Sequence, residues 1–79
     1  MNFKRQRNLR NDFSDAFWKS KLALNRRDGA EAAQELVTMR LIRDRAEALL
    51  IPDDMIERFD ADIASIEKRI AGHDDAAAA

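Results

Sequence analysis

Residues 50–70 read LIPDDMIERFDADIASIEKRI, and this stretch decides the expected fold. Its large apolar residues recur at alternating steps of three and four, the spacing of a packed helix face. They are Ile56, Phe59, Ile63, Ile66 and Ile70, with Met55 beside them. Pro52 ends a preceding helix and suits the first position of the next, where Asp53 and Asp54 favour the positive helix N-terminus. The stretch predicts a helix over about 52–71 that buries one narrow seam.

The preceding predicted helix covers residues 29–50. Asp28 and Glu31 form a capping pattern at its start. Its apolar residues fall on two faces, one with Leu36, Met39, Ile42, Ala46, Leu49 and Leu50, the other with Ala33, Val37, Leu41 and Ala48. Such a helix is expected to lie between neighbours, either centrally in the fold or between the fold and a second subunit. The short connection at 51–52 predicts an antiparallel hairpin with the last helix.

The first predicted helix covers residues 12–27. Asp12 and Asp15 resemble an acidic capping box, and Asp28-Gly29 supplies the break after Arg27. The core-facing residues lie at steps of three and four and are Phe13, Ala16, Phe17, Ser20, Ala23 and Leu24. Outside the helices, residues 1–11 are predicted to be a mobile basic arm and residues 73–79 a disordered tail.

The expected fold is therefore all-α, a three-helix bundle over residues 12–72 built on an antiparallel hairpin. A chain of 79 residues forms one domain, and a domain of this size buries only roughly 60% of its unfolded surface. Fourteen of the apolar residues are Ala, and there is no Cys for a disulfide. Self-association is the remaining source of stability, so the bundle is expected to be a homo-oligomer.

The net charge of −1 conceals a gradient along the chain. Residues 1–27 carry eight Lys and Arg against two Asp, a net charge of +6. Residues 53–79 carry three against eight, a net charge of −5. This gradient predicts one of two arrangements. Either the basic N-terminal region packs against the acidic C-terminal region, or the N-terminal region binds an acidic partner.

Few residues of this sequence could act in catalysis. His73 is the single histidine and follows Gly72, with no nucleophile nearby that it could activate. Asp60 and Asp62 are two residues apart on a helix, so their carboxylates point to different sides. Without Cys, a second His or a Gly-rich loop, we expect no catalytic residues, no metal site, no cofactor and no small-molecule substrate. The chain is not expected to be an enzyme.

Two groups of residues are candidates for binding. Trp18 and Leu22 lie at i and i+4 on the side of the first helix opposite its core stripe, with the cations Lys19, Lys21 and Arg26 nearby. Such a group anchors a protein partner, unless another helix or subunit covers it. The second group is the basic arm, with Lys4, Arg5, Arg7 and Arg10, which suits phosphates or an acidic protein surface.

We therefore expect a non-enzymatic interaction module that binds itself or a larger protein as an adaptor, regulator or inhibitor. The alternative is a nucleic-acid-binding oligomer that uses the arm, such as a phage DNA-packaging or nucleoid-associated protein. The acidic last helix argues against a membrane surface, and the longest run of large apolar residues, at 49–51, is far too short for a membrane span. These features predict a cytoplasmic protein, and the excess of Arg over Lys favours a bacterial or phage source.

Overall fold

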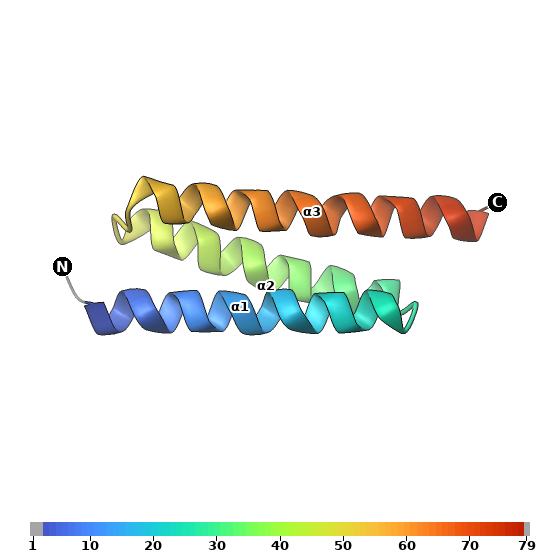
Figure 1. Cartoon of the computed structure of the whole chain (residues 1–79), viewed down its shortest axis with the longest axis horizontal. Coiled ribbons are helices and arrows are strands. Elements are labelled where there is room, and N and C mark those ends of the chain that lie inside the picture. The colour runs from blue at the N-terminus through green and yellow to red at the C-terminus, as the bar shows by residue number, and fades with distance from the viewer. Residues whose placement is uncertain (1–2, 79) are drawn as a thin grey trace.

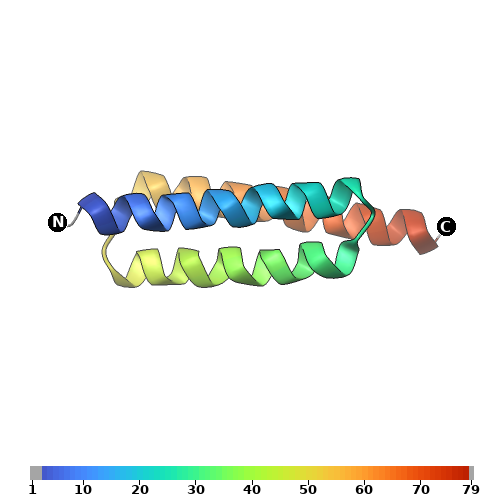
Figure 2. The ribbon, with the colours of Figure 1, turned by 90° about the horizontal axis from the view of Figure 1, so that it is seen from below.

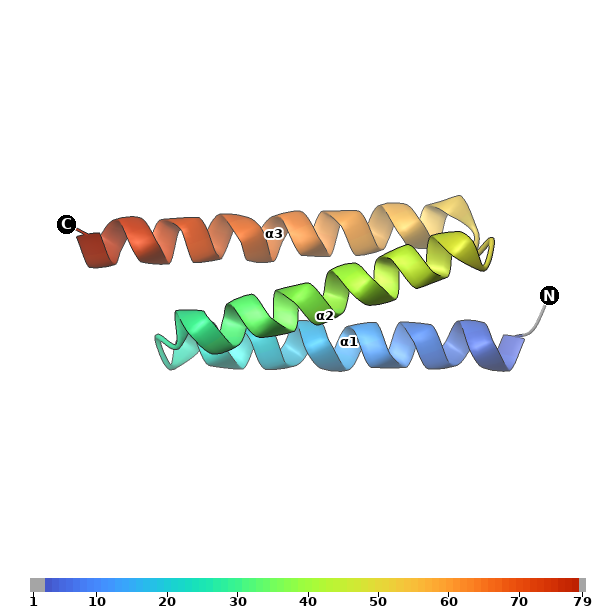
Figure 3. The ribbon, with the colours of Figure 1, turned by 180° about the vertical axis from the view of Figure 1, so that it is seen from behind.

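The computed structural model describes the backbone of residues 3–78 and the side chains of residues 4–72. Three helices are present, α1 (Phe3–Asn25), α2 (Gly29–Ala48) and α3 (Asp53–Ala78). Each helix contacts the other two. α1 and α3 run in the same direction and α2 runs back between their ends (Figure 1, Figure 3). The predicted all-α three-helix bundle is confirmed.

The bundle is long and thin, with extents of 49 × 17 × 14 Å. Figure 2 shows α2 displaced to one side of α1 and α3, which gives the bundle a triangular cross-section. Each helix therefore keeps one side that faces away from the other two. Among the described residues, no helix is long and apolar enough to cross a membrane.

The predicted boundaries of α1 and α3 are wrong at the chain ends. α1 begins at Phe3, so the described part of the expected arm is helical and Asp12 lies inside the helix. Leu9 is buried in the core, and this contact stabilises about two and a half additional turns that the polar sequence of residues 3–11 did not predict. α3 continues to Ala78 instead of ending at 71, which the high helix propensity of the final alanines favours.

Both connections between helices begin with the same hydrogen-bonded turn. The Arg27 amide donates to the Leu24 carbonyl and the Asp28 amide to the Ala23 carbonyl, at 3.0 and 2.8 Å. These two bonds define a Schellman motif, which needs one residue in the left-handed conformation. That residue is Arg27, with φ of 61°, and not the expected Gly29, which opens α2.

The end of α2 repeats this motif, and the repeat explains one wrong burial prediction. Leu50 has φ of 58°, and the Ile51 amide donates to the Ala46 carbonyl at 3.1 Å. The left-handed backbone turns the Leu50 side chain outward, so it is 82% exposed although the helical period assigned it to the core. Pro52 is not a helical residue but accepts from the amides of Met55 and Ile56 as α3 begins.

Asp28 links α1 to α2 with both its backbone and its side chain. Its carboxylate accepts a hydrogen bond of 3.0 Å from the Glu31 amide, which confirms the predicted cap. Asp28→Ala is expected to lower the free energy of unfolding by about 1 kcal/mol, because an N-cap acceptor is lost. Urea unfolding followed by circular dichroism measures the change. Glu57→Ala, at an exposed carboxylate beyond the first turn of α3, is the matched control, and an equal loss there would contradict the assignment.

The core follows the predicted apolar stripes of all three helices. Its buried residues are Leu9, Phe13, Ala16, Ala23, Leu24, Ala32, Leu36, Met39, Ala46, Ile51, Ile56, Phe59, Ile63 and Ile66, with Ser20 also buried. The rings of Phe13 and Phe59 stack at 4.0 Å between centroids and join α1 to α3. The Ser20 hydroxyl donates to the Phe17 carbonyl at 2.6 Å, which satisfies it without a partner from another helix.

The ion pairs that cross between helices join α2 to α3. Arg40 meets Glu67 at 3.1 Å, and Arg43 Nε meets Asp60 at 2.8 Å. The hydrogen bond to Asp60, with smaller contributions from Glu47 and Asp44, raises the pKa of Arg43. Between α1 and α3, Arg69 donates a hydrogen bond of 3.3 Å to Asn25 Oδ1, and burial raises the pKa of Asp62 while the positive charge of Lys21 lowers it.

Candidate interaction surfaces

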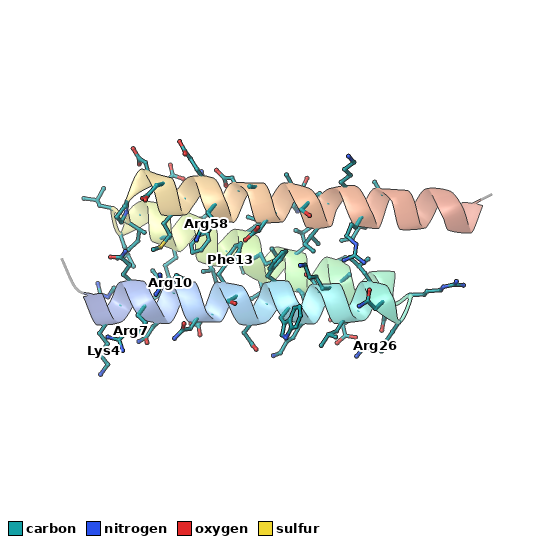
Figure 4. All side chains as sticks on the ribbon, in the orientation of Figure 1. Lys4, Arg7, Arg10, Phe13, Arg26 and Arg58 are labelled. Carbon is teal, nitrogen blue, oxygen red and sulfur yellow. The ribbon has the colours of Figure 1, made fainter. Side chains whose placement is uncertain are left out.

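One side of α1 lies opposite its core stripe. Its positions recur at steps of three and four on the side opposite the core stripe. They are Lys4, Arg7, Asn11, Ser14, Trp18, Lys21 and Asn25, and together with Leu22 beside Trp18 we call them the outer stripe. None of them is acidic. At the edges of the stripe, Asn25 accepts a hydrogen bond of 3.3 Å from Arg69 of α3, Asn11 and Ser14 line the cleft between α1 and α3, and Lys4 lines a cavity with α2. Figure 4 shows Lys4 and Arg7 projecting away from α3, whereas Arg10 and Phe13 lie on the side of α1 that faces Arg58.

The outer stripe carries the large apolar side chains predicted to bind a partner. Trp18 is 63% exposed, and Leu22, one turn further along α1, is also exposed. The expectation that another helix of the chain covers them is therefore wrong for this fold. That a second copy of the chain or another protein binds them stays a prediction.

The three cations predicted to flank Trp18 have different neighbours. Lys21 Nζ lies 4.5 Å from the centre of the Phe17 ring and 5.9 Å from that of Trp18, within reach of a cation–π contact. Lys19 instead pairs with Asp15 at 3.1 Å, and this hydrogen bond raises the pKa of Lys19. Arg26 pairs with Glu31 at 2.6 Å across the first turn. Of the three, only Lys21 is in contact with the aromatic rings.

The four cations of the predicted arm are also separated, because the segment is helical. Lys4 and Arg5 line a cavity of about 430 Å³ between α1 and α2, together with Arg45. Arg7 belongs to the outer stripe. Arg10 lines a cleft between α1 and α3. The helix thus divides the cations among three sides instead of presenting one mobile cluster.

The cleft between α1 and α3 contains charges of both signs. It has a volume of about 280 Å³, and the aromatic rings of Phe13, Phe17 and Phe59 line it. Arg10 and Arg58 share it with Asp62. Burial raises the pKa of Asp62, and the positive charges of Arg58 and Lys21 oppose that shift. Asp62 thus lies toward α1, while Asp60 bonds Arg43, as their spacing predicted.

The second apolar face of α2 is present and uncovered. Leu41 is 65% exposed and Val37 is exposed one turn before it. The small residues that extend this face along α2 are also exposed and are Ala30, Ala33 and Ala48. The sequence identified this face correctly, and the structure leaves it without a neighbour from the same chain.

Sequence reasoning missed that the outer stripe extends through Arg7, Asn11 and Ser14. The signal was available, since these residues continue the spacing of Trp18 toward the N-terminus. Arg7 and Asn11 were overlooked because residues 1–11 were predicted to be a mobile arm, and Ser14 was inside the predicted helix but was not assigned to this side. Arg58 and Asp62 were also missed, although they lie one turn apart beside the seam residue Phe59.

In the part of the chain whose side chains are described, no group of three or more His, Cys, Asp or Glu could hold a metal ion. The side chain of His73 lies outside that part. No protein-family model, curated protein or solved structure matches this chain. The candidate surfaces are therefore interpreted from their own chemistry.

Proposed function

We propose that this chain is a non-enzymatic helical interaction module whose outer stripe binds another protein. The observation that carries this proposal is the outward position of Trp18 and Leu22, which no helix of the chain covers. Exposing a Trp and a Leu one turn apart leaves apolar area in water that a partner would bury, and Trp beside a cation is typical of interface hot spots. An adaptor, regulator or inhibitor needs such a surface and no catalytic group.

Self-association through α2 is part of the same proposal. Val37 and Leu41 form a second uncovered face on a different side of the bundle. Because the two faces belong to different helices, copies joined through α2 would still present their outer stripes to a partner. Several copies on one assembly would raise the effective affinity for a partner that also has several sites.

A nucleic-acid-binding oligomer is the second candidate, and one observation favours it. Lys4 and Arg7 lie on the same stripe as Trp18, so phosphate contacts and base stacking could occur along one side of α1. Deleting residues 1–10 is not a suitable test, since Leu9 belongs to the core. Titration of the full chain with a single-stranded oligonucleotide at low salt, followed by the fluorescence of Trp18, tests this candidate, and an unchanged emission would reject it.

Photo-crosslinking in cells of the source organism tests the proposed function. The photoreactive amino acid p-benzoylphenylalanine replaces Trp18 in one variant and Leu22 in another. Both sites are exposed, so neither replacement disturbs the core. Irradiation is expected to yield protein adducts from both positions, and the mass of each adduct distinguishes a second 9.0 kDa copy from another protein.

Lys68 on α3 provides the matched control position for the crosslinking. It is exposed, and it belongs to a helix whose apolar seam is already buried. The same photoreactive residue placed there measures background capture. Adducts from positions 18 and 22 that do not exceed those from position 68 would reject the interaction module.

A further inference from the structure

We propose that the uncovered face of α2 binds the same face of a second copy of the chain, with the two α2 helices antiparallel and Val37 of each copy opposite Leu41 of the other. The inference rests on the self-association assigned to α2 above and adds the direction and the register of the two helices. It follows from the period of the face, from the order of its residues and from the charges at its edges.

The uncovered face of α2 has the period of an interface between two helices. Its positions follow one another at alternating steps of four and three residues, the spacing that keeps one helix against another. Figure 2 shows α2 displaced to one side of α1 and α3, so a second copy can approach this face along its length. The positions, all of them exposed, are Ala30, Gln34, Val37, Leu41, Asp44 and Ala48, which we call the α2 face.

The order of residues along the α2 face matches its own reverse. When Val37 lies opposite Leu41 of the second copy, the large apolar side chains of both copies meet at the centre of the face. The same register places Gln34 opposite Asp44, where the amide can donate to the carboxylate. Asp44 accepts from Arg43 through Oδ1, but its side chain is 72% exposed, which leaves Oδ2 for Gln34. The alanines at the two ends meet each other, and their small size allows close approach of the helices. Two-fold symmetry makes each of these contacts occur twice.

Other arrangements of two α2 helices lose these matches. In a parallel dimer each position meets itself, so Asp44 lies against Asp44 of the second copy and the like charges repel. Shifting the antiparallel register by one heptad places Leu41 opposite Asp44 in one direction and Val37 opposite Gln34 in the other. Both shifts bury an apolar side chain against a polar one, which leaves the polar group without a hydrogen-bond partner. The register with Val37 opposite Leu41 is therefore favoured.

The charges at the α1 edge of the α2 face also favour this register. It brings Arg45 toward Glu31 of the second copy, at positions that form ion pairs between packed helices. Among the described side chains, Arg45 has no ion-pair partner, although Asp12 lines the same cavity. Glu31 accepts from Arg26 through Oε2, and its side chain is 41% exposed, so Oε1 remains for a second cation.

The α3 edge of the α2 face contains one like-charge contact. Arg40 of the two copies lie near each other beside the symmetry axis, and their positive charges oppose association. Each Arg40 pairs with Glu67 of its own copy at 3.1 Å, which reduces the repulsion. At the α1 edge, the corresponding position is Thr38, which carries no charge. The two Arg45–Glu31 contacts therefore outnumber the single unfavourable one.

A charge exchange between positions 34 and 44 provides the test. Gln34→Glu places a carboxylate opposite Asp44 of the second copy at two symmetric contacts, so it is expected to weaken the dimer about tenfold. Adding Asp44→Lys turns both contacts into ion pairs and is expected to restore the affinity to within about threefold of the unchanged chain. The two positions are about 15 Å apart within one helix, so they do not pair inside one copy. Sedimentation equilibrium of the full chain measures the dissociation constant.

Ser65→Glu on α3 is the matched control for the charge exchange. It adds the same single negative charge at an exposed position away from the α2 face, and it should leave the dissociation constant unchanged. Circular dichroism of each variant checks that the helices still form.

Disulfide formation reports the direction of the two helices independently, because the chain contains no Cys. A disulfide needs Cα atoms within about 7 Å of each other. In glutathione buffer, a mixture of the Val37→Cys and Leu41→Cys variants is expected to form the mixed dimer, and each variant alone is expected to form far less. A parallel dimer would give the opposite pattern.

Three results would overturn the inference. A chain that stays monomeric at high concentration would exclude association through α2. A dimer that Gln34→Glu does not weaken would use another surface. Weakening by Gln34→Glu without recovery on adding Asp44→Lys would indicate another register or direction. If adducts to another protein form at Trp18 and Leu22 in cells while the chain stays monomeric in solution, the interaction module stands and this inference falls.

Discussion

Phe59→Ala is expected to lower the free energy of unfolding by about 3–5 kcal/mol. Phe59 is 2% exposed, and its ring lies 4.0 Å from that of Phe13, with 16° between the planes. Removing it leaves a cavity where α1 meets α3 and takes away an aromatic stack. The free energy of unfolding of a domain of this size is only about 5 kcal/mol, so the variant should be largely unfolded at moderate temperature.

Urea unfolding followed by far-ultraviolet circular dichroism measures this loss. Glu57→Ala is the control, since Glu57 is exposed two residues earlier on α3 and should change stability by no more than about 0.5 kcal/mol. Phe13→Ala tests the same contact from α1. Unfolding of the Phe59 variant at the same urea concentration as the Glu57 variant would show that the stack does not form.

Met39→Ala is expected to cost about 2–5 kcal/mol. Met39 is 0% exposed on α2 and is among the largest fully buried side chains of the described residues. Met39→Leu conserves the volume and should cost less than about 1.5 kcal/mol. The difference between the two variants separates the cost of the cavity from any effect of replacing the thioether.

Leu41→Ala is the matched control for Met39 and also reports on self-association. Leu41 lies two residues further along the same helix but is 65% exposed. In a monomer its loss should cost no more than about 0.5 kcal/mol. A larger cost that depends on protein concentration would indicate that a second copy covers this face of α2. Sedimentation velocity on both variants checks that interpretation.

The seam of α3 and the cap of α2 could be predicted because both depend on nearby residues. Ile56, Phe59 and Ile63 recur with the helical period, and the Asp28 carboxylate reaches an amide three residues away. The start of α1 could not be predicted in this way. Its first turn has no acidic residue, and burial of Leu9 against the rest of the bundle stabilises this part of the helix.

In the candidate site, too, some features could be predicted from nearby residues and others could not. The pairing of Trp18 with Leu22 on one side of α1 was predicted, because residues four apart lie on one helix face. The ion pairs of Lys19 and Arg26 were not anticipated, although their partners Asp15 and Glu31 lie only four and five residues away. Charged side chains have several partners within reach, and the tertiary arrangement selects among them.

The sequence by itself determined that this chain forms three helices and where the apolar core stripe of each helix lies. It also determined that positive charge concentrates in the N-terminal region and negative charge in the C-terminal region. Helical period, propensity and composition are properties of neighbouring residues. Only the tertiary structure decided which apolar faces are buried, since that depends on how many helices meet. The three helices cover the Phe13 side of α1 and the Met39 side of α2, and they leave Trp18 and Leu41 exposed.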